Sequence, residues 1–118
     1  MALNLSAKFY GFGSYFERAQ AQSNDVDLLI IHADYTAESI ELALECKRGV
    51  IAVMPTAHVT ILSHREECEL EFIRKCRAIP LGAITPGNVQ SGIDVLEKLI
   101  RSFYEVDRPT VQNSRTEL

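Results

Sequence analysis

Apolar and polar positions divide the chain into alternating segments of strand and helix length. Residues 8–13, Lys-Phe-Tyr-Gly-Phe-Gly, form an aromatic-rich run that ends in glycine, which predicts a strand whose exit brings the backbone close to another group. Residues 26–31, Val-Asp-Leu-Leu-Ile-Ile, are aliphatic and form the clearest strand in the chain. Residues 58–62, His-Val-Thr-Ile-Leu, predict the next strand.

Helical segments are predicted between these strands. Ser14 can open a helix directly after the first strand, and Thr36 can cap another. Residues at helical spacing in this second helix are Ile40, Ala43, Leu44 and Lys47. Whether residues 50–54 continue the helix stays open, because Gly49 weakens it and Pro55 ends the apolar stretch.

Ser63 and Glu66 form a capping box that predicts a further helix after the third strand. We interpret its stripe as core: Cys68, Phe72, Ile73 and Cys76. The acidic residues of this helix are interpreted as N-terminal charge and a solvated face: Glu66, Glu67, Glu69 and Glu71. The three cysteines lack metal-site spacing and predict buried reduced thiols.

The C-terminal part of the chain predicts a loop followed by a helix. Residues 80–87, which contain two prolines and two glycines, predict the loop, and the helix is expected at about 91–105. Its stripe consists of Ile93, Leu96, Leu99, Ile100 and Phe103, buried within the domain or against another chain. The alternation predicts one α/β (α+β) domain over residues 1–106, a small mixed sheet flanked by helices, with a polar tail at 107–118.

Composition narrows the function classes. Hydrophobic residues make up 47% and charged residues 24% of 118 residues, the balance of a globular domain. A net charge of −4 without a long basic run gives no strong signal for nucleic acid. No apolar run approaches the ~20 residues that span a bilayer, and the first residues lack a secretory pattern. We therefore expect a cytoplasmic protein with no membrane partner.

One constellation carries chemistry. Phe12-Gly13-Ser14 is followed by ten residues and then by Asp25-Val26-Asp27-Leu28. Residues two apart on a strand share a face, so Asp25 and Asp27 predict two adjacent carboxylates, which suit Mg²⁺ together with substrate phosphates. Gly13 allows close backbone approach, and the Ser14 hydroxyl can bind phosphate oxygens. The alternative interpretation is a pair of solvated turn residues and a glycine bulge.

These residues resemble the signature of the nucleotidyltransferases of the DNA polymerase beta superfamily, and the flank Ser23–Leu29 is similar to the minimal nucleotidyltransferases. The resemblance covers roughly residues 7–75. It implies a polymerase-beta-like nucleotidyltransferase fold, with Gly13 and Ser14 as phosphate contacts and Asp25 and Asp27 as catalytic ligands of Mg²⁺ or Mn²⁺. The substrate implied is ATP or another nucleoside triphosphate.

The same resemblance implies transfer of a nucleotidyl group, usually AMP, to a hydroxyl on a protein or nucleic-acid partner, with pyrophosphate leaving. Small domains of this kind often act as antitoxins of toxin-antitoxin pairs. They silence a helical HEPN-type (higher eukaryotes and prokaryotes nucleotide-binding) toxin by adenylylating it. The resemblance therefore implies such a toxin as a protein partner of this chain.

Two positions depart from the family pattern. The family places a third carboxylate on a later strand, and by register its place falls on Thr60, which cannot serve alone as a general base near neutral pH. Glu66, Glu67 or His58 are candidates to replace that acid, although we interpret His58 as a partly buried structural histidine. Glu17 stands where the family often has arginine.

These departures keep two other functions open. One is a catalytically degenerate domain that binds nucleotide or a partner without transferring a group. The other is a small α/β protein-interaction module whose C-terminal helix is the docking face.

Overall fold

A computed structural model describes residues 5–16, 25–33 and 36–107. The elements run β1 (Ala7–Phe12), the short 3-10 helix η1 (Ser14–Phe16), β2 (Val26–His32), α1 (Ala37–Val53), β3 (Ala57–Ser63), α2 (His64–Leu70), α3 (Phe72–Cys76), β4 (Ile79–Ile84), the 3-10 helix η3 (Pro86–Asn88) and α4 (Val89–Asp107). The prediction of a small mixed α/β domain is confirmed.

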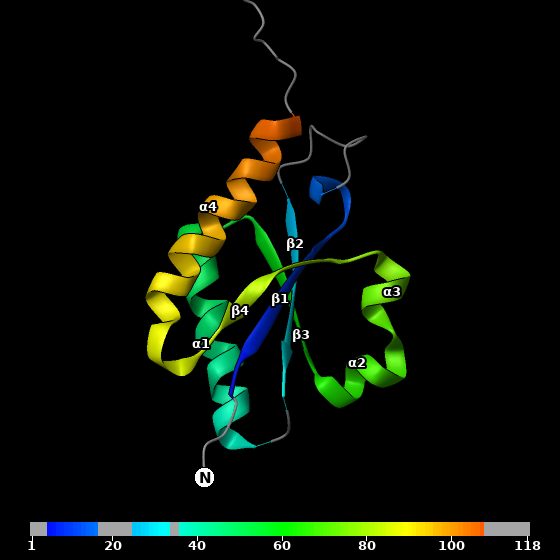
Figure 1. Ribbon diagram of the computed structural model, residues 1–118, viewed down its shortest axis with the longest axis vertical. Helices are drawn as coiled ribbons and strands as arrows, with labels where there is room; N and C mark the ends of the chain where they lie inside the picture. The colour runs from blue at the N-terminus through cyan, green and yellow to red at the C-terminus, as the bar shows by residue number, and fades with distance from the viewer. Residues whose placement is uncertain (1–4, 17–24, 34–35, 108–118) are drawn as a thin grey trace, which may run out of the picture.

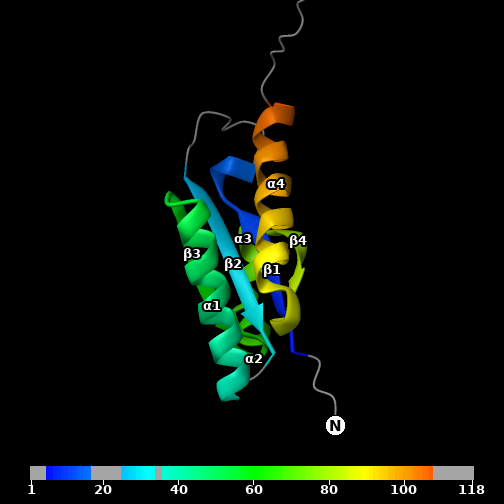
Figure 2. The ribbon, with the colours of Figure 1, turned by 90° about the vertical axis from the view of Figure 1, so that its left-hand side faces the viewer.

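The four strands form one sheet in the order β3-β2-β1-β4. β1 is antiparallel to both of its neighbours, whereas β2 and β3 are parallel. α1 and α4 lie side by side on one face of this sheet, and α2 and α3 lie on the other side (Figures 1 and 2). The central strand β2 is therefore covered on both faces, which explains its nearly continuous apolar sequence.

The main core lies between the sheet and the pair α1 and α4. β1 contributes alternate residues, including Phe9, and β2 contributes Leu28 and Ile30. The face that α1 buries consists of Ser39, Leu42, Ala43, Cys46 and Val50. Ile40 and Leu44, which share the predicted helical spacing, are exposed. α1 runs through to Val53, so the segment left open in the sequence is helical.

Thr36 and Ser63 are N-caps, as predicted, whereas Ser91 and Asp94, which the sequence also offers as caps of the C-terminal helix, lie inside α4. The Thr36 side chain accepts a hydrogen bond from the Ser39 amide at 3.1 Å. Ser63 and Glu66 exchange side-chain-to-backbone hydrogen bonds of 3.1 and 2.8 Å, which is the predicted capping box.

The predicted helix after Ser63 is interrupted, and its stripe is not core. Glu71 has φ 53° and ψ 43°, and this left-handed residue separates α2 from α3. Cys68 is exposed and Cys76 is half-buried, so only Cys46 fits the expectation of buried thiols. Phe72 still packs on the sheet, edge to face against Phe12, with ring centroids 5.1 Å apart.

The prediction of a loop over residues 80–87 is wrong, because residues 79–84 form the edge strand β4. β4 pairs with β1 on one side only, and its register shifts between Phe9 and Tyr10. An edge strand tolerates Pro80, since one row of its backbone groups needs no partner. Gly82, with φ 147°, fits the irregular pairing.

α4 begins at Val89, two residues before the expected start near residue 91. Its buried residues Ile93, Leu96 and Ile100 belong to the main core, whereas Leu99 is exposed. The stripe is therefore buried mainly within the domain. Residues 108–118, most of the predicted polar tail, lie outside the described residues.

Candidate functional site

Gly13 and Asp27 meet at one end of the sheet. β1 ends at Phe12, which pairs with Asp27 of β2, so the next residue, Gly13, lies over the Asp27 side chain. Gly13 has φ 80°, and a Cβ atom at this position would lie 2.5 Å from Oδ2 of Asp27. The missing side chain at Gly13 therefore makes room for the carboxylate beside the backbone.

Ser14 begins η1 directly after this contact and is half-buried. The amide of Phe16 donates to the carbonyl oxygen of Gly13 at 3.1 Å, which closes the turn. The Tyr15 hydroxyl donates to the carbonyl oxygen of Ile100 at 3.0 Å, and Phe16 packs edge to face on Phe103, with centroids 5.2 Å apart. These contacts with α4 fix η1, and with it the positions of Gly13 and Ser14.

The two aspartates have different surroundings. Asp27 lies in β2 and its side chain is 30% exposed, whereas Asp25 is exposed and precedes the strand, which begins at Val26. Among the described residues, no set of three His, Cys, Asp or Glu side chains is placed to hold a metal ion. Asp27 is therefore the carboxylate that the fold positions against Gly13.

The neighbouring strand β3 corrects the interpretation of His58. His58 pairs with Asp27 in the parallel ladder, and its Nδ1 lies 3.7 Å from Oδ1 of Asp27. Its side chain is 67% exposed, so the interpretation of a partly buried structural histidine is wrong. Thr60 pairs with Leu29, one step further along the same face. The strand pairing thus brings an imidazole, not an acid, beside Asp27.

Glu66 and Glu67, the acids considered as replacements, are engaged elsewhere. Glu66 completes the capping box of α2. The Glu67 carboxylate accepts hydrogen bonds from the backbone amides of Phe72 and Ile73, at 3.1 to 3.3 Å. Glu17 lies outside the described residues, so its position relative to the site is not described.

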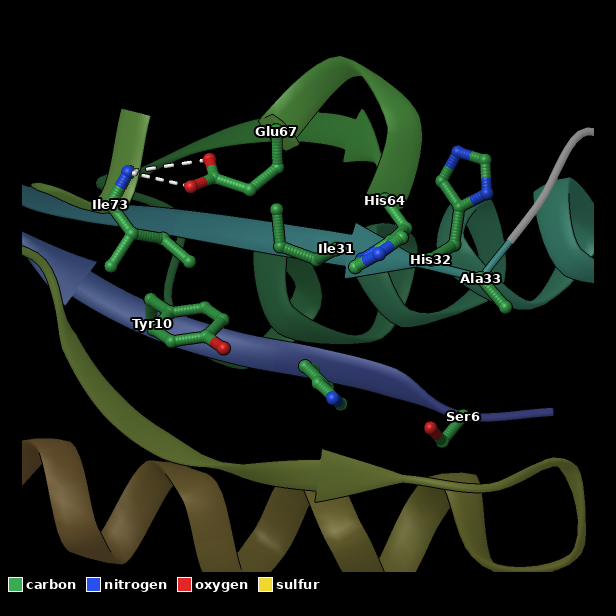
Figure 3. A pocket seen from close by; sticks show the side chains of 9 residues that line it. Ser6, Tyr10, Ile31, His32, Ala33, His64, Glu67 and Ile73 are labelled. Atoms are coloured by element: carbon green, nitrogen blue, oxygen red, sulfur yellow. Dashed lines mark hydrogen bonds between the residues drawn. The ribbon is translucent and has the colours of Figure 1, made fainter. Parts of the chain in front are cut away.

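A separate cavity of about 450 Å³ lies on the same face of the sheet, toward the other end of β1. Lys8 and Tyr10 line it from β1, and His64, Glu67 and Ile73 line it from α2 and α3. Figure 3 shows the Glu67 carboxylate turned toward the Ile73 amide. Lys8 pairs with Ile31, far along the ladder from Asp27, so the cavity does not include the predicted site residues.

The cysteines have no place in the site. Burial raises the pKa of the Cys46 thiol from 9.0 to about 11, and the nearby Glu45 carboxylate acts in the same direction. Cys68 lies 3.6 Å from Nε2 of His64 on the exposed surface of α2.

Comparison of the chain with protein-family models, curated proteins and solved structures gave no significant match. Within the described residues, no helix is long and apolar enough to cross a membrane.

Proposed function

We propose that this chain is a divalent-metal-dependent nucleotidyltransferase that transfers AMP from ATP to a hydroxyl on a protein or nucleic-acid partner. The observation that carries the proposal is the close approach of Gly13 to the Asp27 carboxylate, made where the paired strands β1 and β2 lie next to each other. The sequence resemblance predicts this pairing of a glycine turn with an aspartate strand.

The donor set is compatible with Mg²⁺ or Mn²⁺. Asp27 offers a partly exposed carboxylate at the end of the sheet, and Asp25, two residues earlier, offers a second one. Hard cations accept such a sparse protein site when water and phosphate oxygens complete the coordination. A bound metal would neutralise charge on the phosphate oxygens during transfer.

The remaining residues would orient the nucleotide. Because Gly13 lacks a side chain, the phosphates can approach its backbone, and the Ser14 hydroxyl at the start of η1 can donate to a phosphate oxygen. The acceptor oxygen would bond to the α-phosphorus as its proton passes to water, while the bond to the β-phosphate breaks and pyrophosphate leaves. Since no acid faces Asp27 from β3, positioning and charge neutralisation would supply most of the catalysis.

Thermal unfolding in constant Mg²⁺, with and without millimolar ATP, tests nucleotide binding. A ligand at 100 times its dissociation constant stabilises by ~2.7 kcal/mol, which raises the midpoint of a small domain by several degrees. Asp27→Asn should abolish the rise. The matched control Asp94→Asn, which changes an exposed carboxylate on α4, should retain it. If ATP raises the unfolding midpoint of neither the wild-type protein nor Asp94→Asn, the proposed site is wrong.

Group transfer is tested with labelled ATP and candidate acceptors. Label from the α-phosphate should enter the acceptor, whereas label from the γ-phosphate should not. The HEPN-type toxin that the sequence resemblance implies is the first acceptor to test, and its mass should increase by one AMP. This partner would make the chain an antitoxin.

A catalytically degenerate binding domain is the second candidate, and the absence of an acid from β3 favours it. In that case ATP still stabilises the protein, but no label is transferred. The biological effect should then survive Asp25→Ala combined with Asp27→Ala.

An interaction module is the third candidate, because Val95 and Leu99 are exposed apolar residues one turn apart on α4. Loss of partner capture in a folded Leu99→Asp variant, without any triphosphate binding, would support it.

A further inference from the structure

The side chains of Asp27 and His58 lie close together but do not form a hydrogen bond with each other. The Nδ1 to Oδ1 distance of 3.7 Å is longer than a hydrogen bond. Within the described part of the chain, His58 makes no other side-chain hydrogen bond or ion pair. Both side chains are accessible, at 67% and 30% exposure. A nitrogen donor and an oxygen donor therefore lie close together, and both are accessible to solvent.

Their separation suits one shared ion. Two donors bound to a single metal at ~2.0–2.2 Å lie roughly 3–3.5 Å apart. Shortening the observed distance of 3.7 Å by a few tenths of an ångström would bring the two donors to this separation, and the exposed His58 side chain has room to move. The next pair along the ladder, Leu29 and Thr60, offers no comparable donor set.

We propose that His58 is a metal ligand together with Asp27, and that the site therefore binds a first-row transition-metal ion such as Mn²⁺ more tightly than Mg²⁺. This inference rests on the proposed metal-nucleotide site. Imidazole nitrogen binds transition metals well, whereas Mg²⁺ strongly prefers oxygen ligands in an octahedral shell. The imidazole that replaces an acid beside Asp27 thus changes the choice of metal.

The donor pair also couples the metal to the nucleotide. Asp27 and His58 supply two ligands, and Asp25 is the further carboxylate named above. Among the described residues, no set of three His, Cys, Asp or Glu side chains is placed to hold a metal ion alone, so water and phosphate oxygens would complete the coordination. ATP should therefore increase the affinity for Mn²⁺, and Mn²⁺ should increase the affinity for ATP by the same factor.

Mn²⁺ titration followed by electron paramagnetic resonance tests the assignment directly, because the signal of the free ion falls as it binds. In wild-type protein with ATP, pulsed measurements should detect coupling to an imidazole nitrogen. His58→Ala should remove that coupling and weaken Mn²⁺ binding at least tenfold, with a smaller effect on Mg²⁺. The control His64→Ala changes another exposed histidine and should leave the nitrogen coupling and the Mn²⁺ affinity unchanged.

The variant Asp27→Asn distinguishes failure of the His58 assignment from failure of the proposed metal-nucleotide site. If it weakens Mn²⁺ binding while His58→Ala does not, and no nitrogen coupling is seen, His58 is not a ligand although the metal site stands. If Asp27→Asn also leaves Mn²⁺ and ATP binding unchanged, the proposed function itself fails. Circular dichroism spectra that match wild type would show that each variant is folded.

Discussion

At the scale of single residues, a substitution at Gly13 tests whether the turn after β1 needs a residue without a side chain beside the Asp27 carboxylate. Gly13→Ala places a side chain at φ 80° and a Cβ atom 2.5 Å from Oδ2 of Asp27. We expect a loss of ~1–3 kcal/mol in the free energy of unfolding, together with loss of ATP binding. Gly87→Ala is the matched control, because a Cβ atom there meets nothing within 4 Å. Equal stability of the two variants in urea unfolding would contradict this geometry.

Cys46 predicts a dependence of stability on pH. Burial raises its pKa in the folded protein to about 11, whereas the unfolded thiol titrates near 9.0. Well below pH 9.0 the thiol is neutral in both states, and its contribution to stability is complete. As the pH rises from 9.0 toward 11, the unfolded state loses its proton first, so this contribution is lost.

Urea unfolding between about pH 8 and about pH 10.5 measures this loss. Cys46→Ala should flatten the pH dependence relative to wild type, although it also lowers stability at every pH by leaving a cavity. Cys68→Ala, which removes an exposed thiol, should keep the wild-type slope. A slope that is unchanged in Cys46→Ala would show that another group causes it.

Single residues also show how far the sequence predicts the site. The spacing of Gly13 and Asp27 predicts their association, because Gly13 directly follows one strand and Asp27 lies in the next, and both strands are recognisable from local pattern. His58 was misinterpreted, because its exposure and its pairing with Asp27 depend on the parallel alignment of β2 and β3. A strand sequence does not specify its register against a neighbour that is distant in the chain.

At the scale of elements, Glu67 stabilises the break between α2 and α3. Its carboxylate accepts from the amides of Phe72 and Ile73, which would otherwise lack partners at the start of α3. We expect Glu67→Ala to cost ~1–2 kcal/mol in unfolding free energy. Glu69→Ala removes only an exposed ion pair with Arg65 and should cost less than about 0.5 kcal/mol. Similar losses in chemical unfolding would show that the cap contributes no more than the ion pair.

The elements that sequence pattern missed are those in which tertiary contacts override local preference. Pro80 and Gly82 favour a loop, yet pairing with β1 holds this segment as an edge strand. The continuous helix predicted after Ser63 is broken at Glu71, whose left-handed conformation a capped apolar stripe does not reveal. The sequence predicts strands β1, β2 and β3, since an aromatic-rich run identifies β1 and runs rich in aliphatic residues identify β2 and β3.

At the scale of the whole molecule, α4 connects the core to the site. Its buried face packs on the sheet, and its last turns contact η1 through the Ile100 carbonyl and Phe103. The mixed α/β class was predictable from the alternation of elements, whereas the placement of α4 against η1 was not. A helix that both fills the core and supports the Gly13 turn should affect stability and ligand binding together.

Two substitutions compare the buried face of α4 with its exposed face: Ile100→Ala and Val95→Ala. Ile100 is 1% exposed, so its truncation should lower the free energy of unfolding by ~2–5 kcal/mol, whereas Val95 is 68% exposed and should change it by less than about 0.5 kcal/mol. Thermal unfolding with and without ATP measures both effects at constant Mg²⁺. A smaller ATP-induced rise in Ile100→Ala than in Val95→Ala would mean that α4 supports the proposed nucleotide site through η1. If the rise is equal in both variants, α4 stabilises the core alone, and the Gly13 turn must be held by β1 and β2.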